Sequence, residues 1–235
     1  MSFLSSSVES TTKTIINVDD IIIYIPTGSV RGSGGILWPA ARVLATYICS
    51  GHTGNIISGA HVLELGSGTH ALPGLAAYFC GAKKVVITDI PLVAIHHVDA
   101  ISVNSSTADT LSTIRSAVFL FGSNMRRSLG ADSIFFDTIL IADVISLDES
   151  LYLPLRKTLL DASYINERIV ILFSTRERSQ FEQLFWKGLI IDGWVLELRH
   201  REICSIEDGD TGSAHIDIIA ATRKHTHTPT DAVMQ

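Results

Sequence analysis

The chain has 235 residues, of which 46% are hydrophobic, and its formal net charge is −6 at pH 7. That hydrophobic content supplies one sizeable core and excludes a globally disordered chain. A negative net charge repels phosphate backbones, so nucleic acid is not expected as a partner, whereas a basic protein or a cationic substrate would suit it.

Residue spacing argues against a metal site and against a membrane span. The three cysteines share no C-x-x-C spacing and the nine histidines share no H-x-x-x-H spacing, so no metal site is expected. Asp137 and Asp143 interrupt the apolar stretches before they reach the roughly 18 residues that a membrane helix needs. The first residues also lack the basic and apolar regions of a signal peptide. We therefore expect a monomer in the cytoplasm or the nucleus, without a membrane partner.

The N-terminal segment, residues 1–34, is expected to lie outside the main domain. Its first 13 residues are rich in serine and threonine, which favours a disordered tail. Two β-rich runs within residues 15–25 predict a hairpin or an edge strand, and the glycine-rich residues 27–35 predict a mobile loop. Residues 38–48, which begin with Trp-Pro, predict an amphipathic helix, because proline is tolerated in a first helical turn.

Strands and helices alternate through the rest of the chain. Strands are predicted at residues 62–65, 85–88, 117–120, 138–142, 169–173, 194–198 and 216–221, and helices at residues 72–79, 92–103, 149–160 and 179–188. Such alternation predicts a mostly parallel sheet with helices on both faces. Only a polar loop, residues 199–215, joins the last two strands, which predicts an antiparallel pair at one edge.

The expected fold class is therefore α/β, with a Rossmann-like sheet of seven strands. This domain is predicted to occupy residues 35–223, and residues 224–235 are predicted to form a disordered tail.

The most informative segment is the turn after the strand at residues 62–65. Residues 62–69 read Val-Leu-Glu-Leu-Gly-Ser-Gly-Thr, and Asp89 closes the next strand. Gly66 and Gly68 would let a ligand approach the backbone where a Cβ would block it. An acid about 20 residues beyond such a turn is typical of a ribose-binding carboxylate. The third glycine of the dinucleotide pattern is missing, which favours a nucleoside ligand without phosphates.

The ends of the predicted strands carry residues suited to one ligand. Ligands of open α/β sheets bind outside the carboxyl ends of the strands, near the reversal of strand order. The residues at four of these ends are Gly66, Asp89, Phe121 and Asp143. Together they predict a nucleoside pocket with a close backbone, a ribose acceptor, an aromatic face for adenine and a carboxylate near the reacting end.

Three other polar features are expected to have no part in this pocket. The charged run Arg176-Glu177-Arg178 is expected to face solvent. Asn104 is expected to cap the C-terminus of a helix, and His70 to be an ordinary polar residue of a loop.

Several longer segments resemble the seven-β-strand S-adenosylmethionine-dependent methyltransferases, and within them the methyltransferase-like group that modifies protein lysines. The most specific are Trp-Pro-Ala-Ala at residues 38–41 and Ala-Asp-Val-Ile at residues 142–145, and the loop at residues 62–69 matches as well. The resemblance spans roughly residues 34–222. It implies S-adenosylmethionine as the cofactor and methyl transfer to a protein side-chain nitrogen, with lysine favoured over arginine.

The resemblance also implies roles for individual positions. Seven of them would touch the cofactor: Trp38, Glu64, Gly66, Gly68, Asp89, Phe121 and Asp143. Those of the glycine loop would line its methionine and ribose parts, and Asp89 would hold the ribose hydroxyls. Phe121 would stack on adenine, and Trp38 would close the cofactor side of the pocket. Asp143 would begin an acidic-x-x-aromatic motif that contacts the substrate amine, so it is the predicted catalytic residue.

One departure from the family pattern leaves the function open. Ser146 stands where the family has tyrosine or phenylalanine, whose ring helps to shape the lysine channel. Tyr152, one or two helical turns further on, is the alternative source of a ring. Two other functions fit: a small-molecule N-methyltransferase, and a catalytically weak protein that binds S-adenosylmethionine and acts through a partner.

Overall fold

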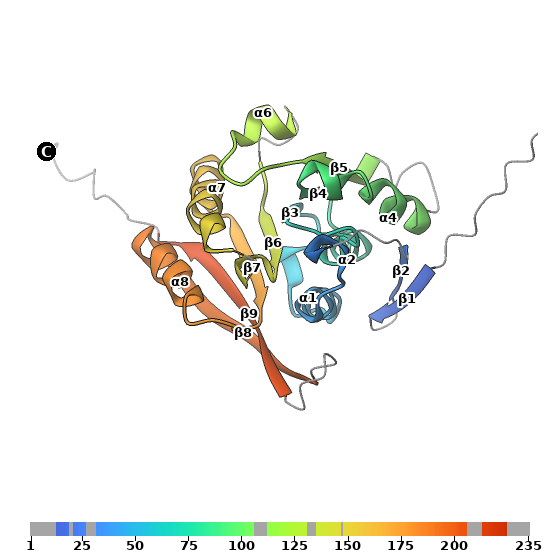
Figure 1. Ribbon diagram of the computed structural model, residues 1–235. Helices are drawn as coiled ribbons and strands as arrows, with labels where there is room; N and C mark the ends of the chain where they lie inside the picture. Colours follow the sequence, from blue (N-terminus) through green and yellow to red (C-terminus); the bar gives the residue numbers. More distant parts are fainter. Residues whose placement is uncertain are drawn as a thin grey trace, which may run out of the picture.

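Seven strands form one mixed sheet with the order β5-β4-β3-β6-β7-β9-β8 (Figure 1). The computed structural model describes residues 13–18, 21–26, 32–105, 112–130, 135–146, 148–205 and 213–224. The strands of the sheet are β3 (His61–Leu65), β4 (Lys84–Asp89), β5 (Ile114–Val118), β6 (Thr138–Ala142), β7 (Val170–Thr175), β8 (Trp194–Ser205) and β9 (Ser213–Arg223). The five strands β5, β4, β3, β6 and β7 pair in parallel with their neighbours in the sheet. Strand β9 pairs antiparallel with both β7 and β8. The predicted mostly parallel sheet with an antiparallel edge pair is confirmed.

Helices cover both faces of this sheet. They are α1 (Pro39–Cys49), α2 (Leu72–Phe79), α3 (Pro91–Ala94), α4 (His97–Asn104), α6 (Met125–Leu129), α7 (Tyr152–Ile165) and α8 (Glu182–Ile191). The protein has two hydrophobic cores, one on each face of the sheet. The first contains residues of α1, α2 and α4, and the second contains residues of α6, α7 and α8 (Figure 1). Neighbouring residues of β3 point to opposite layers, Val62 to the first core and Leu63 to the second. Central strands therefore read as continuous apolar runs.

Several elements lie where the sequence predicts them. Helix α2 and strand β6 have the predicted bounds. Trp38 is extended and Pro39 is the first residue of α1, as expected of a proline with no N–H to offer the helix. Helix α7 begins at Tyr152 and is preceded by a short 3₁₀ turn, Glu149–Leu151, so the predicted helix start at residue 149 is only approximate.

Two predicted elements on the α4 side differ from the structure. The helix expected at residues 92–103 is broken at Ile95 and His96 into α3 and α4. Strand β5 begins at Ile114 and ends at Val118, whereas residues 117–120 were predicted. This strand pairs only with β4 and lies at the edge of the sheet, so pairing rather than a continuous apolar run defines its bounds.

The predicted polar loop at residues 199–215 is wrong for most of its length. Strands β8 and β9 continue their pairing to Ser205 and Ser213, and this ribbon extends beyond the rest of the sheet in Figure 1. An ion pair of 2.6 Å joins Arg201 to Asp217 across the two strands. Arg199, His200, Arg201 and Ile203 are all exposed on β8, so this part of the strand gives no hydrophobic alternation that a sequence pattern could reveal.

The N-terminal segment forms a hairpin, one of the two forms predicted for it, and Ile23 and Ile25 of this hairpin belong to the first core. Strands β1 (Lys13–Val18) and β2 (Ile21–Pro26) pair antiparallel and lie beside α4 (Figure 1). The predicted tails and most of the predicted mobile loop, residues 1–12, 27–31 and 225–235, lie outside the described residues. Within the described ranges, no helix combines the length and the apolar character that a membrane crossing requires.

Candidate active site

A cavity of about 440 Å³ opens at the carboxyl ends of the central strands. Strands β3 and β6 are neighbours in the sheet, and the strand order reverses between them. This is the position at which open α/β sheets bind ligands. The positions predicted to touch a cofactor all line the cavity: Trp38, Glu64, Gly66, Gly68, Asp89, Phe121 and Asp143. The structure brings them together, and the role of each remains a prediction.

The loop after β3 requires glycine at two positions. Gly66 and Gly68 have φ angles of +68° and +61°, in the left-handed region that side chains disfavour. A Cβ on Gly66 would lie 2.6 Å from a methyl carbon of Val144, and one on Gly68 would lie 3.2 Å from the carbonyl oxygen of Gly34. Backbone therefore forms this wall of the cavity.

Asp89 is fixed at the end of β4 by two backbone donors. The amide of Gly68 donates to Oδ2 at 2.8 Å, and the amide of Ile90 donates to Oδ1 at 2.7 Å. Burial raises the pKa of Asp89, although both donors oppose that shift. Because each carboxylate oxygen can accept about two hydrogen bonds, Asp89 keeps the capacity to accept bonds from a pair of hydroxyls.

Glu64 is a carboxyl group buried inside the sheet. It is 1% exposed, and its Oε2 accepts a hydrogen bond of 2.9 Å from the amide of Gly74. Burial raises the pKa of Glu64 well above its ordinary value, and the charge of Asp89 adds to that effect. A cationic group in the cavity would stabilise the ionised form of this carboxyl.

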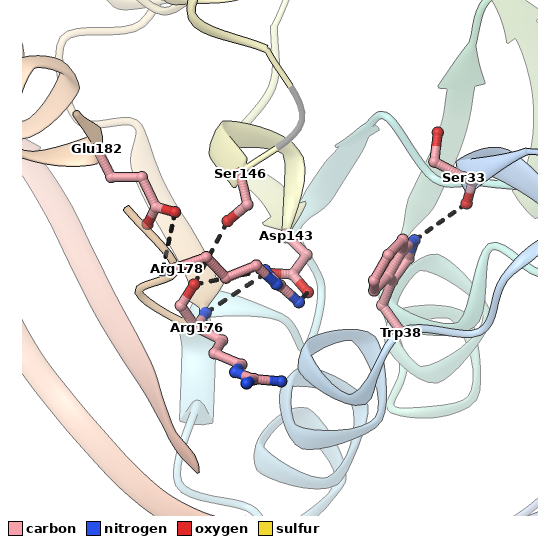
Figure 2. A network of polar contacts seen from close by, with 7 residues as sticks. All are labelled: Ser33, Trp38, Asp143, Ser146, Arg176, Arg178 and Glu182. Atoms are coloured by element: carbon pink, nitrogen blue, oxygen red, sulfur yellow. Dashed lines mark hydrogen bonds and ion pairs between the residues drawn. The ribbon is translucent and has the colours of Figure 1, made fainter. Parts of the chain in front are cut away.

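Asp143 does not face the cavity alone, because Arg178 binds it. Asp143 is 4% exposed, and Arg178 donates to it twice, from Nη1 to Oδ1 at 2.6 Å and from Nη2 to Oδ2 at 2.7 Å (Figure 2). The prediction that this arginine is merely solvated is wrong. The pair joins residues 35 positions apart, from the loops after β6 and β7, so no local pattern could reveal it.

Trp38 links this ion pair to the N-terminal side of the cavity. The guanidinium carbon of Arg178 lies 5.2 Å from the centre of the Trp38 ring, a distance typical of a cation–π contact. The indole Nε1 donates to the carbonyl oxygen of Ser33 at 3.0 Å (Figure 2). Trp38 thereby holds the 3₁₀ turn Ser33–Gly35 beside the cavity, which supports the prediction that it closes the pocket.

Phe121 and Ser146 fall on different sides of the site. The ring of Phe121 is half-buried in the turn after β5 and would lie 3.6 Å from a Cβ placed on Gly66. Ser146 does not line the cavity; it lines a second, adjacent pocket together with Tyr152. Tyr152 lines the same pocket as Ser146 and not the cavity, so its proposed role as the ring of a lysine channel stays a prediction.

Two histidines near the glycine loop are more buried than the sequence suggests. His70 was expected to be an ordinary polar residue, but it is buried and lines the cavity, and burial and the charge of Arg42 lower its pKa. His97 lies behind the loop, where its Nε2 is 2.9 Å from the carbonyl oxygen of Gly68 and its Nδ1 is 2.8 Å from Oγ of Ser116. The break between α3 and α4 turns this ring inward.

These features fit a nucleoside cofactor that carries a cationic amino-acid part. Gly66 and Gly68 line the cavity with backbone, and their left-handed φ angles disfavour any side chain there. The buried carboxyl of Glu64 suits a cation, and Asp89 suits a diol. Within the described residues, no three His, Cys, Asp or Glu side chains form a group that could hold a metal ion.

Comparison with known sequences gives one family. The sequence profile of a family described as lysine methyltransferase matches residues 17–190. A segment is 33% identical over 114 residues to protein N-terminal and lysine N-methyltransferase efm7 of Schizosaccharomyces pombe, and covers 46% of this chain and 43% of that protein. A shorter segment is 41% identical over 58 residues to EFM7 of Yarrowia lipolytica, and covers 25% and 20%. The chain thus spans less than half the length of these curated relatives.

Comparison with solved structures supports the fold. The methyltransferase domain of the bacterial protein CtHen1 superposes with a TM-score of 0.56 at 14% identity, covering 78% of this chain and 98% of that domain. Magnesium protoporphyrin IX methyltransferase of Synechocystis, solved with bound S-adenosylmethionine, gives a TM-score of 0.53 at 13% identity, covering 78% and 79%. At such identities the likeness shows the Rossmann-like methyltransferase fold alone.

Proposed function

This chain belongs to the lysine methyltransferase family, and we propose that it transfers a methyl group from S-adenosylmethionine to a protein side-chain nitrogen, with lysine favoured over arginine. The observation that carries the proposal is the cavity at the reversal of strand order, which gathers the glycine loop, the buried carboxyl of Glu64, the carboxyl of Asp89 at the end of β4 and the aromatic ring of Phe121. Each of these groups matches one part of that cofactor.

The chain's own contribution to the reaction is binding and alignment. The cofactor supplies an electrophilic methyl group on a sulfonium. Correct alignment of an amine with such a methyl group is worth about 7–11 kcal/mol. A lysine side chain in water has a pKa of about 10.4, so it must also lose a proton before it attacks.

Asp143 is the residue proposed to act on that amine. Its Oδ1 accepts from Nη1 of Arg178 and from the amide of Arg176, whereas its Oδ2 accepts only from Nη2 of Arg178 among the described residues, so Oδ2 can accept about one more hydrogen bond. Asp143 would orient the amine and receive its proton through water, while Arg178 keeps the carboxylate in place.

A protein N-terminal amine is a second candidate acceptor. The curated relatives carry both activities in their names, protein N-terminal and lysine N-methyltransferase. Both acceptors are primary amines, so the same carboxylate could orient either one. We further propose that the chain works as a monomer in the cytoplasm or nucleus and that nucleic acid is not its substrate, which the net charge of −6 supports.

Labelled S-adenosylmethionine added to a cell lysate with the purified protein tests the proposal. Label in protein, found by mass spectrometry on lysine or on an N-terminal nitrogen, is the expected result. Label in a small product would instead identify a small-molecule N-methyltransferase. Cofactor binding without any labelled product would identify a catalytically weak binding protein.

A further inference from the structure

A second pocket, of about 320 Å³, lies beside the cofactor cavity. Its polar walls are Ser146, Asp148, Glu149, Tyr152, Arg178 and Glu182, and we call it the acidic pocket. None of the described residues lines both this pocket and the cavity. The ion pair of Arg178 with Asp143 stands between the two, since Arg178 lines one and Asp143 lines the other.

The acidic pocket carries an excess of negative charge. It holds three carboxylates, Asp148, Glu149 and Glu182, and one guanidinium, Arg178. Both terminal nitrogens of that guanidinium already donate to Asp143, and its carbon lies over Trp38. Arg178 also interacts electrostatically with Glu182, but this single cation stands against three carboxylates, so the lining keeps a negative net charge that attracts a cation.

Glu182 is the group that distinguishes this pocket from a cluster of surface acids. It is the first residue of α8 and only 2% exposed. Its Oε1 accepts a hydrogen bond of 3.1 Å from the amide of Arg178 (Figure 2). Its Oε2 is buried and has no hydrogen-bond partner among the described residues. A buried carboxylate oxygen without a donor is unfavourable, so a ligand that brings a donor would be held.

Tyr152 also lines the acidic pocket, and the three carboxylates act on its hydroxyl group. Burial raises the pKa of its hydroxyl, and the charges of Glu182, Glu149 and Asp148 raise it further. The Tyr152 hydroxyl therefore stays protonated and can donate a hydrogen bond. The same three carboxylates would attract a cationic group that enters the pocket beside Tyr152.

We propose that the acidic pocket binds a second cationic side chain of the protein substrate, an arginine or a lysine close in sequence to the methylated nitrogen. Glu182 is the buried carboxylate that recognises it. This inference rests on the proposed function, because it describes how a protein substrate is chosen. The second cation is bound but not methylated, since the Asp143–Arg178 pair separates it from the cofactor cavity.

Peptide binding tests this inference without requiring catalysis. Two fluorescent peptide pools share a central lysine and differ only in whether the flanking positions carry arginine or its neutral analogue citrulline. Anisotropy is measured with the full chain and S-adenosylhomocysteine. We expect the arginine pool to bind about 10-fold more tightly, as for one charge-assisted hydrogen bond.

The variant Glu182→Gln should reduce this preference to about twofold or less, because the amide keeps the shape and the acceptor for Arg178 but loses the charge. The matched control is Glu167→Gln, which removes the same charge at an exposed turn before β7 and should keep the full preference. If the first variant does not fold, Glu149→Gln at the exposed rim should still lower the preference about twofold.

An arginine preference that is missing in the native protein, or equal in the native protein and the folded Glu182→Gln variant, overturns the inference. Failure of the proposed function has a different signature. In that case the lysate assay gives no labelled protein, whereas the preference for arginine and its dependence on Glu182 persist.

Discussion

Asp143 is held in place by the protein before any substrate arrives. Its φ angle of +60° lies in the left-handed region, which a residue other than glycine adopts only when its surroundings impose it. The surroundings here are the bidentate bonds from Arg178 and a hydrogen bond of 2.9 Å from the amide of Asp143 to the carbonyl oxygen of Ser174. The carboxylate thus projects beside the cavity with its orientation already set, as positioning of a substrate amine requires.

The variant Asp143→Asn should separate catalysis from binding. It preserves the shape but removes the charge that would receive a proton, so turnover should fall about 100-fold. Affinity for S-adenosylhomocysteine, measured by calorimetry, should fall much less than turnover. Asp161→Asn on the surface of α7 is the control, because it removes the same charge from a pair with Lys157 far along that helix. Full turnover by the Asp143 variant would make this residue a structural partner of Arg178 only.

Asp89 is predicted to set the affinity for the cofactor. Asp89→Ala removes a charged acceptor whose hydrogen bonds are worth roughly 1.5–3 kcal/mol, so affinity for S-adenosylhomocysteine should fall about 10- to 150-fold. Asp99→Ala on the exposed surface of α4 should leave the affinity unchanged. A folded Asp89→Ala protein with native affinity in calorimetry would contradict the assignment of Asp89 to the ribose.

Helix α2 is shaped by the same carboxyl that it helps to bury. Its amide at Gly74 donates to Glu64, and a Cβ on Gly74 would lie 2.5 Å from Oε2 of Glu64 and 2.5 Å from a methyl carbon of Ile87. A glycine inside a helix is destabilising by itself. Here it permits the helix to pack closely enough on β3 and β4 to hydrogen-bond a side chain within the sheet.

One polar side chain of α4 bonds to the backbone of the N-terminal hairpin, in addition to the apolar packing of Ile23 and Ile25. Asn104 was expected to cap its helix, and its Nδ2 does donate to the carbonyl oxygen of Ala100 at 2.8 Å. The same amide group also accepts from the amide of Tyr24 at 2.8 Å and donates to its carbonyl oxygen at 2.7 Å. Asn104 therefore acts as a short substitute for a neighbouring strand beside β2.

Replacing Asn104 by alanine should loosen this hairpin. The variant Asn104→Ala removes two hydrogen bonds to the backbone of Tyr24, which should lower the free energy of unfolding by about 1–3 kcal/mol. Amides of residues 21–25 should exchange hydrogen faster, as followed by mass spectrometry. Ser102→Ala, on the exposed side of the same helix, should change neither quantity. Unchanged exchange in the Asn104 variant would show that apolar packing alone holds the hairpin.

At the scale of the whole molecule, the sheet joins the two halves of the proposed site. The first layer supplies the glycine loop and Trp38 through α1 and α2, and the second supplies Tyr152 and Glu182 through α7 and α8. Asp143 and Arg178 come from neighbouring strand ends between them. The cofactor cavity and the acidic pocket therefore depend on the packing of both faces.

One buried group should make the stability of the molecule depend on pH. Burial lowers the pKa of His97 to about 4, whereas an unfolded histidine titrates near 6.5. Between these values the unfolded state binds more protons, so the free energy of unfolding falls as the pH falls from 6.5 towards 4. For His97 this loss is about 2 kcal/mol between pH 7 and pH 5.

Urea unfolding of the variant His97→Gln at pH 7 and pH 5 measures that contribution. The variant is expected to lose less stability than the native protein on acidification, although it is less stable at pH 7 because the bonds to Gly68 and Ser116 change. His215→Gln, at an exposed position of β9, should keep the native pH dependence. An identical pH dependence in all three proteins would exclude His97 as the titrating group.

The sequence by itself determined the features that arise from neighbouring residues. Apolar runs and their spacing predicted the helix at residues 72–79 and the strand at residues 138–142 with their observed bounds. Glycine and acid at successive strand ends predicted which side chains would meet, because parallel strands present their carboxyl ends at one edge. Apolar runs, glycines and strand-end acids can be recognised from the sequence because short stretches of residues determine backbone conformation and which face is buried.

Only the tertiary structure decided which charges pair and which remain alone. Arg178 reaches Asp143 across 35 positions, although its own neighbourhood indicates a solvated charge. Glu182 is buried with one oxygen unpartnered among the described residues, and the ribbon of β8 and β9 continues through a polar segment. Such outcomes depend on distances between segments that come together only when both layers pack on the sheet. The energy of an ion pair or of a buried carboxylate depends on the distances to charges and donors from other segments. No short stretch of sequence contains that information.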